Sequence, residues 1–287
     1  MKIGIEMNPF SSGYCRYGDD RYKKIKEHGF SAVDFGMADT GTVIYTASQE
    51  ESDAFLINEK RMAEEAGIII NQVHGPWRWP ARDFEPEDRA ERMEKMKKSI
   101  RATYVLGCKN WVIHPIMPFG VQDKGTENEK MTWDMNIGFM KELLKTAKEY
   151  DITICFENMP MKEFSISTPE KILEFVKEMN DPNFKICLDT GHVSVFEKKL
   201  SLGEEVRRVG EEIKVFHIHD NKVGYDLHMM PYFGVIDWTD FSKSLKDINF
   251  DGVFSLETVP PAHLSDDLFE KCALLLSGIA KDIIDKA

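Results

Sequence analysis

The chain has 287 residues, of which 42% are hydrophobic, and it carries a formal net charge of −12. This length fits one or two domains, and equally a single α/β barrel of roughly 250 residues with additions. The negative charge provides no general attraction for nucleic acid or for an anionic membrane surface, so proteins that bind either through their overall charge are disfavoured.

Strand-like and helix-like segments alternate along the whole chain. Short apolar runs predict strands over 3–7, 32–37, 68–74, 110–114, 152–157, 184–189, 213–218 and 252–257. Amphipathic segments predict helices over 19–29, 51–67, 86–107, 128–150, 169–180 and 201–212, from 237 or 239 onward, and from 264 onward. Residues 38–49 lack periodicity and are predicted to be a loop. Eight such units without a flexible linker predict one (β/α)8 barrel domain over 1–287.

In six of the predicted strands an apolar run leads to a histidine or a carboxylate at or next to the end of the strand: His74, His114, Glu157, Asp189, His217 and Glu257. A (β/α)8 barrel brings the C-terminal ends of all its strands to one mouth, so these side chains should converge. Carboxylate oxygens and imidazole nitrogens together suit a divalent ion such as Mn²⁺, Zn²⁺, Co²⁺ or Mg²⁺. We predict a metal site at the C-terminal face of the barrel. Its expected ligands are Glu157, Asp189, His217 and Glu257 from the last four strands.

Three further residues follow these strand ends closely. His192 stands three residues after Asp189 in DTGH, and Asp226 and His228 form an Asp-x-His pair. Each has two interpretations. A short turn can direct such a side chain toward the predicted metal site, but the same turn is also explained by a residue that caps a helix or lies in a loop. His74 and His114 are equally open, as metal or substrate ligands or as hydrogen-bonded core residues.

The motifs VHGP, IHP, ENMP, CLDTGH, FHIHD, DLH and LET occur in this order in the xylose isomerase-like barrel superfamily, which the chain resembles over nearly its whole length. That superfamily contains sugar phosphate isomerases, ketose 3-epimerases and endonuclease IV. Resemblance to the epimerases implies one divalent metal, with Zn²⁺ or Mn²⁺ expected ahead of Mg²⁺ or Co²⁺, and it implies that Glu157 and Glu257 transfer protons. Resemblance to endonuclease IV implies a three-zinc cluster held by these nine residues: His74, His114, Glu157, Asp189, His192, His217, Asp226, His228 and Glu257.

The loops bear on the choice between these enzymes. A DNA-repair enzyme needs basic loops to follow the phosphates, yet residues 36–52 contain no Lys or Arg, and residues 117–130 contain only Lys124 and Lys130. This favours an isomerase or epimerase of a sugar or sugar phosphate, acting through a metal-stabilised enediolate. The alternatives are an endonuclease IV-like phosphodiesterase, a metal-dependent hydrolase or lyase of a modified sugar, and a non-catalytic binding barrel. Association into a homo-oligomer is a further option.

Aromatic residues near the strand ends are candidates for the substrate pocket. Trp77, Arg78 and Trp79 directly follow His74, and they suit sugar stacking with a hydroxyl or phosphate contact. Phe233 and Trp238 lie in PYFGVIDW, where relatives often have PGEGxIDW, and this change predicts a bulkier and drier pocket. For all five residues the alternative is packing of the rim against neighbouring loops.

Cysteine usage and the N-terminus bear on the compartment. The five cysteines form no CxxC pair, and Cys155 and Cys187 inside apolar strands are predicted to be small core residues. The N-terminal MKIGIEMN lacks the apolar stretch of a signal peptide, and no apolar run approaches the ~20 residues of a membrane span. We therefore expect a reduced, cytoplasmic protein.

Overall fold

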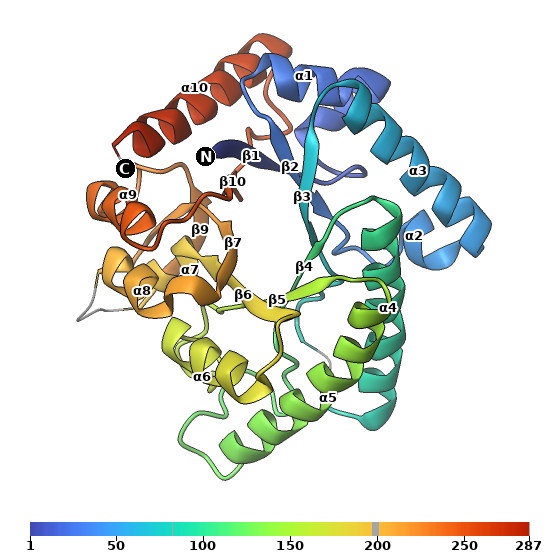
Figure 1. Cartoon of the computed structure of the whole chain (residues 1–287), viewed down its shortest axis with the longest axis vertical. Coiled ribbons are helices and arrows are strands. Elements are labelled where there is room, and N and C mark those ends of the chain that lie inside the picture. The colour runs from blue at the N-terminus through green and yellow to red at the C-terminus, as the bar shows by residue number, and fades with distance from the viewer. Residues whose placement is uncertain (82, 197–200, 287) are drawn as a thin grey trace.

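The computed structural model describes residues 1–81, 83–196 and 201–286. Eight parallel strands form the central sheet: β1 (Lys2–Met7), β2 (Ala32–Gly36), β3 (Ile69–His74), β4 (Asn110–Ile113), β5 (Thr153–Glu157), β6 (Phe184–Asp189), β7 (Ile213–His217) and β10 (Val253–Leu256). They pair in the order β10-β1-β2-β3-β4-β5-β6-β7. An isolated parallel bridge between Ile218 and Leu256 joins the two outer strands. The predicted (β/α)8 barrel is thereby confirmed (Figure 1).

An outer ring of helices covers the strands in Figure 1: α1 (Arg21–Glu27), α3 (Gln49–Glu65), α4 (Pro86–Val105), α5 (Glu129–Glu149), α6 (Pro169–Met179), α8 (Leu202–Val209), α9 (Trp238–Asp247) and α10 (Asp266–Asp285). Local sequence explains where they begin. Thr168 accepts a hydrogen bond from the backbone of Lys171, and Pro169 occupies the first turn of α6. Among the described residues, no helix combines the length and the hydrophobicity needed to cross a membrane.

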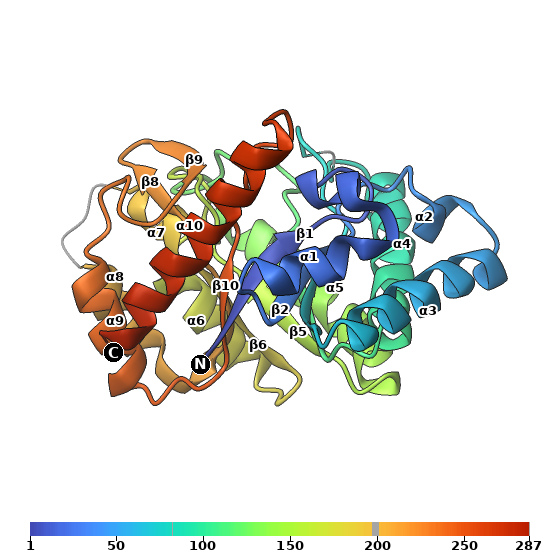
Figure 2. The ribbon, with the colours of Figure 1, turned by 90° about the horizontal axis from the view of Figure 1, so that it is seen from above.

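The structure also contains short elements that the sequence patterns did not predict: α2 (Val43–Thr46), α7 (Thr190–Ser194), β8 (Asp220–Lys222) and β9 (Tyr225–Met229). Two 3₁₀ helices adjoin predicted helices: η1 (Gly13–Asp20) leads into α1, and η2 (Gly210–Glu212) ends the helix predicted over 201–212. The predicted loop over 38–49 therefore contains a helix, which is too short to produce a periodic pattern. Strands β8 and β9 form an antiparallel hairpin between β7 and α9. Figure 2 shows this hairpin and α7 at the upper edge of the barrel, opposite the two termini.

Small apolar side chains fill the barrel below its mouth. Val112, Cys155, Cys187 and Val215, one from each of β4 to β7, form a buried cluster. Both cysteines are free and buried, as expected of small core residues, and Cys187 also lies with Glu157 and His217 in a group that could hold an ion. This layer supports the strand ends from beneath, where the candidate site lies.

Candidate metal centre and pocket

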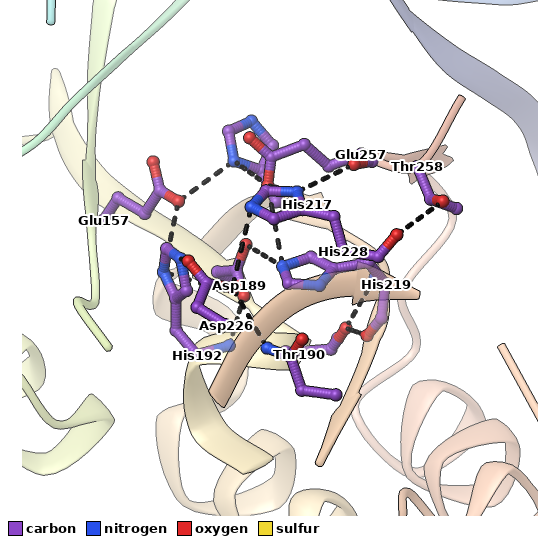
Figure 3. A network of polar contacts seen from close by, with 12 residues as sticks. Glu157, Asp189, Thr190, His192, His217, His219, Asp226, His228, Glu257 and Thr258 are labelled. Carbon is purple, nitrogen blue, oxygen red and sulfur yellow. Dashed lines mark hydrogen bonds and ion pairs between the residues drawn. The ribbon is translucent and has the colours of Figure 1, made fainter. Parts of the chain in front are cut away.

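Four acidic and histidine side chains converge where strands β5, β6, β7 and β10 end. Glu157, Asp189 and His217 are the last residues of β5, β6 and β7, and Glu257 directly follows β10. Nδ1 of His217 lies 3.0 Å from Oε1 of Glu157 and 3.4 Å from Oε2 of Glu257. One ligand atom from each of the four residues lies within 4.8 Å of the others. Figure 3 shows these side chains pointing toward one another. We call this set the quartet.

The quartet is buried in a way that fits a bound cation. The side chains of Glu157, Asp189 and His217 are fully buried, and that of Glu257 is 14% exposed. Oε2 of Glu257 is buried and accepts no hydrogen bond from a described residue. Burial and the neighbouring carboxylates hold the pKa of Glu257 well above its ordinary value. Three carboxylates in so small a volume are costly unless a positive charge balances them, and a divalent ion supplies that charge.

A carboxylate that the sequence patterns did not identify lies behind His217. Oδ2 of Asp34, on β2, is 2.9 Å from Nε2 of His217. Gln72 donates hydrogen bonds to the same oxygen at 2.6 Å and to the carbonyl of Phe216 at 3.2 Å. Nε2 of His217 has no hydrogen-bond partner among the described residues, so the contact with Asp34 is electrostatic. A carboxylate this close favours the tautomer that carries its proton on Nε2, which leaves Nδ1 to face the quartet.

The two histidines of β3 and β4 face the quartet from across the mouth. Nε2 of His114 lies 3.0 Å from Oε2 of Glu157, and Nε2 of His74 lies 3.6 Å from the same oxygen. Burial lowers the pKa of His114 to about 4, so its imidazole is neutral at physiological pH. His74, His114 and Glu157 together form a second group that could hold an ion.

A third group lies on the other side of the quartet, between α7 and the hairpin. Asp226 Oδ2 is 3.4 Å from Nε2 of His192, and Asp226 Oδ1 is 3.6 Å from Nε2 of His228. Burial opposes the protonation of His192, but the charge of Asp189 and a hydrogen bond to Asp226 raise its pKa to about 10. Burial likewise opposes protonation of His228, and Glu257 and Asp226 raise its pKa to about 11.

His219 belongs to this third group and was missed by sequence reasoning. Its Nε2 lies 3.0 Å from Oδ2 of Asp189, and its ring stacks on that of His228 with centroids 4.1 Å apart. The signal was present in FHIHD, because alternate residues of an extended chain point to the same side and His217 was already a candidate.

Above these groups lies a pocket of about 440 Å³. Of the predicted pocket residues, Trp77 and Trp79 line it. So do Glu6 and Asn8 from the end of β1 and the residues after it, and Met159, Pro160 and Met161 from the loop after β5, none of which was predicted. The predicted candidates His74, His114, His192, Asp226, His228 and Glu257 complete much of its inner surface.

The structure places the other three predicted pocket residues elsewhere, and none of them is among the described residues that line this pocket. Arg78 extends toward α4, where its guanidinium lies 3.5 Å from Glu91. Trp238 is 2% exposed and donates a hydrogen bond to Asp220 at 2.9 Å, which fixes the start of α9. Phe233 is 59% exposed on the outer part of the hairpin connection.

Comparison with known proteins places this geometry in a family. The chain is 25% identical over 268 residues to D-psicose 3-epimerase of Enterocloster bolteae, covering 90% of this chain and 82% of that protein. It is 27% identical over 217 residues to the probable endonuclease 4 of Acholeplasma laidlawii, covering 70% and 69%. A solved D-tagatose 3-epimerase-like protein matches with a TM-score of 0.74 and 25% identity, over 99% of this chain and 97% of that one. Residues 22–273 match the family model, and the chain therefore belongs to the xylose isomerase-like TIM barrel family.

Proposed function

We propose that the protein is a divalent-metal-dependent isomerase or epimerase of a sugar. The observation that carries this proposal is the placement of Glu157 and Glu257. They come from separate strands, approach the same nitrogen of His217, and belong to a quartet beneath a pocket. The sugar epimerases among the relatives support the same reaction class. Cytoplasmic location fits such an enzyme and is part of the proposal.

The quartet residues Glu157, Asp189, His217 and Glu257 would hold the ion. When bound, a divalent ion polarises a carbonyl and the neighbouring hydroxyl and stabilises the enediolate that forms on proton loss. Inversion of a carbon centre also needs one group to remove a proton and another to return one from the opposite face. Glu157 and Glu257 are assigned these two tasks. His192, in α7, is assigned to orient a substrate hydroxyl.

Exchange of hydrogen with solvent tests this assignment directly. Protein loaded with Mn²⁺ or Zn²⁺ would be incubated in D₂O with D-psicose, D-tagatose and D-fructose, and the sugars would be analysed by NMR. We expect deuterium at a carbon next to the carbonyl, loss of this exchange after treatment with a chelator, and recovery when metal is added back. Metal-loaded protein that exchanges hydrogen into none of these ketoses would count against the proposal.

A second candidate, a phosphodiesterase, is favoured by one specific observation. Besides the quartet, four further groups among the described residues could hold an ion. Two of them, His74–His217–Glu257 and Glu157–Cys187–His217, share two residues with the quartet. The other two extend to either side of it: His74, His114 and Glu157, and His192, His219, Asp226 and His228. Metal content per chain, measured by mass spectrometry, separates the candidates. One ion supports the epimerase, whereas three ions together with nicking of abasic-site DNA at physiological salt would support the phosphodiesterase.

A further inference from the structure

The pocket has two chemically different parts. Its floor consists of carboxylates and histidines, among them Glu6, Asp34, Asp226, His228 and Glu257. The wall formed by the loops after β2, β3 and β5 consists of Ala38, Trp77, Trp79, Met159, Pro160 and Met161. A ligand that fills the pocket therefore meets hydrogen-bonding groups at one end and only apolar side chains along one side.

The described lining of the pocket contains no lysine or arginine. Phosphate groups in proteins are usually held by such residues or by helix N-termini. Arg78 follows Trp77 directly, but its guanidinium lies within 4.0 Å of Asp83 and 3.5 Å of Glu91, on the side of α4. Four carboxyl-bearing residues line the floor instead, Glu6, Asp34, Asp226 and Glu257, and the basic side chains among the described lining residues are histidines.

Glu6 is well placed to bind a neutral polar ligand. It stands near the end of β1, lines the pocket, and makes no hydrogen bond or ion pair with a described residue. Burial and the charge of Asp34 raise its pKa. A carboxyl group without a protein partner accepts hydrogen bonds from sugar hydroxyls readily.

The apolar wall starts directly at the histidines of the floor. The ring of Trp77 meets that of His114 edge to face, with centroids 4.4 Å apart, and Trp79 lies 6.4 Å from Trp77. Trp79 is 61% exposed although it lines the pocket. The two tryptophans thus form a continuous surface from the candidate site to the pocket entrance, and most of its outer part is exposed to solvent.

The loop that carries these tryptophans is held in place from below. Asp83 is fully buried, accepts a hydrogen bond from the backbone of Met117 at 2.9 Å, and pairs with Arg92 of α4 at 2.5 Å. This ties the loop after β3 to the loop after β4 and to α4. A tryptophan on an anchored loop loses little conformational freedom when a ligand covers it, which favours binding.

We propose that the substrate is an uncharged sugar that has a free ketone and, away from that ketone, carries a flat apolar substituent such as an aryl group. The sugar would lie on the floor of carboxylates and histidines, and the substituent would lie against Trp79. This inference rests on the proposed function, because it assumes sugar chemistry at the floor. A free hexose at the floor would leave Trp79 in water, whereas the pocket falls within the range of about 300–1,000 Å³ that is usual for larger ligands.

Matched pairs of sugars test the proposal by binding alone. Isothermal titration of Mn²⁺-loaded protein would compare the phenyl and methyl glycosides of D-glucose, D-galactose, D-mannose and D-xylose, which serve as unreactive analogues because they lack a ketone. We expect the phenyl member of at least one pair to bind about tenfold or more tightly, which corresponds to about 1.4 kcal/mol. Trp79→Ala should remove this difference. Phe233→Ala, which truncates an equally exposed aromatic side chain outside the pocket, should leave it unchanged. Glucose 6-phosphate should bind no more tightly than glucose.

The possible failures are distinguishable. If methyl glycosides bind and phenyl glycosides bind no more tightly, or if Phe233→Ala acts like Trp79→Ala, the apolar substituent is refuted while the sugar chemistry stands. Tenfold tighter binding of glucose 6-phosphate than of glucose would refute the uncharged substrate. If no glycoside binds the metal-loaded protein, the inference fails, whereas the proposed function stands or falls separately with the exchange of hydrogen into the ketoses.

Discussion

The barrel strands and the β8–β9 hairpin both present metal-ligand side chains, but they hold them differently. Asp189 and His217 are register partners on the parallel strands β6 and β7, and their side chains are fully buried. Asp226 and His228 lie on a short edge strand, with side chains 31% and 42% exposed. Groups on packed strands keep a fixed geometry, whereas groups on an exposed hairpin can change with the ligand or between relatives. We therefore assign the proton-transfer chemistry to residues on the strands, and the adaptation of the site to different ligands to residues on the hairpin.

The largest effect is expected from the strand glutamates. Glu157→Gln and Glu257→Gln each remove a proton-transfer group while keeping its size, so kcat should fall by about 10²- to 10⁴-fold. Circular dichroism should show a folded protein in both cases. Glu149→Gln, at the exposed end of α5, is the matched control and should retain full activity. Full activity of the double variant that carries both Glu157→Gln and Glu257→Gln would contradict the assignment of proton transfer to the strand glutamates.

A smaller effect is expected from the carboxylate behind His217. Asp34→Asn keeps the shape but weakens the hold on the histidine tautomer, so metal affinity should fall by about 10- to 100-fold. Because Asp34 is assigned a positioning role, activity should recover largely at saturating metal. Asp19→Asn changes an exposed carboxylate outside the pocket and serves as the control. Loss of kcat that excess metal does not restore would contradict this role.

The hairpin should be more tolerant than the strands. His228→Ala should raise KM by about tenfold, the effect of one lost hydrogen bond of about 1.4 kcal/mol, with a smaller change in kcat. Steady-state kinetics with the best ketose from the exchange experiment would measure both constants. If His228→Ala lowers kcat as strongly as Glu157→Gln, the distinction between strands and hairpin is wrong.

The smallest effect is expected from removing an ion pair that lies outside both the strand ends and the hairpin, and this effect concerns stability alone. Arg101 of α4 pairs with both oxygens of Asp53 of α3 at 2.6 Å, and its hydrogen bonds hold the pKa of Asp53 below the ordinary value. The pair therefore stabilises the fold above the unfolded-state pKa of about 3.9, and this contribution is lost as the pH falls through the lower folded-state value.

Asp53→Asn should accordingly lower the free energy of unfolding by about 0.5–1 kcal/mol at pH 7, and by nearly nothing near pH 2. Denaturant unfolding at the two pH values measures the difference. Neither the activity nor the metal affinity should change, because the pair touches neither the strands' quartet nor the hairpin. An equal loss at both pH values would show that the effect does not come from the ion pair.

The contrast between strands and hairpin also explains what the sequence could predict. Glu157 and Asp189 were identified because strand endings are local patterns, and the barrel then determines where such endings meet. Asp34 was missed because its partner, His217, is distant in sequence and meets it only across the closed barrel. The hairpin was missed for a similar reason: Asp220 holds it by accepting hydrogen bonds from the backbone of Val235 and Ile236. Such contacts between distant residues leave no periodic signal.

The single bridge that closes the barrel has a mechanical consequence. Ile218 donates to Ser255 at 2.9 Å, and Glu257 donates back to Ile218 at 3.0 Å, so few backbone hydrogen bonds join β7 to β10 at this seam. His217 and Glu257 stand on the two sides of this seam. An ion bound to both would therefore link β7 to β10 where few backbone hydrogen bonds do so. Backbone amides along the seam should then exchange with solvent more slowly once the ion is bound. In this protein, metal binding at the candidate site would also stabilise the contact between the first and last strands of the sheet order, β10 and β7.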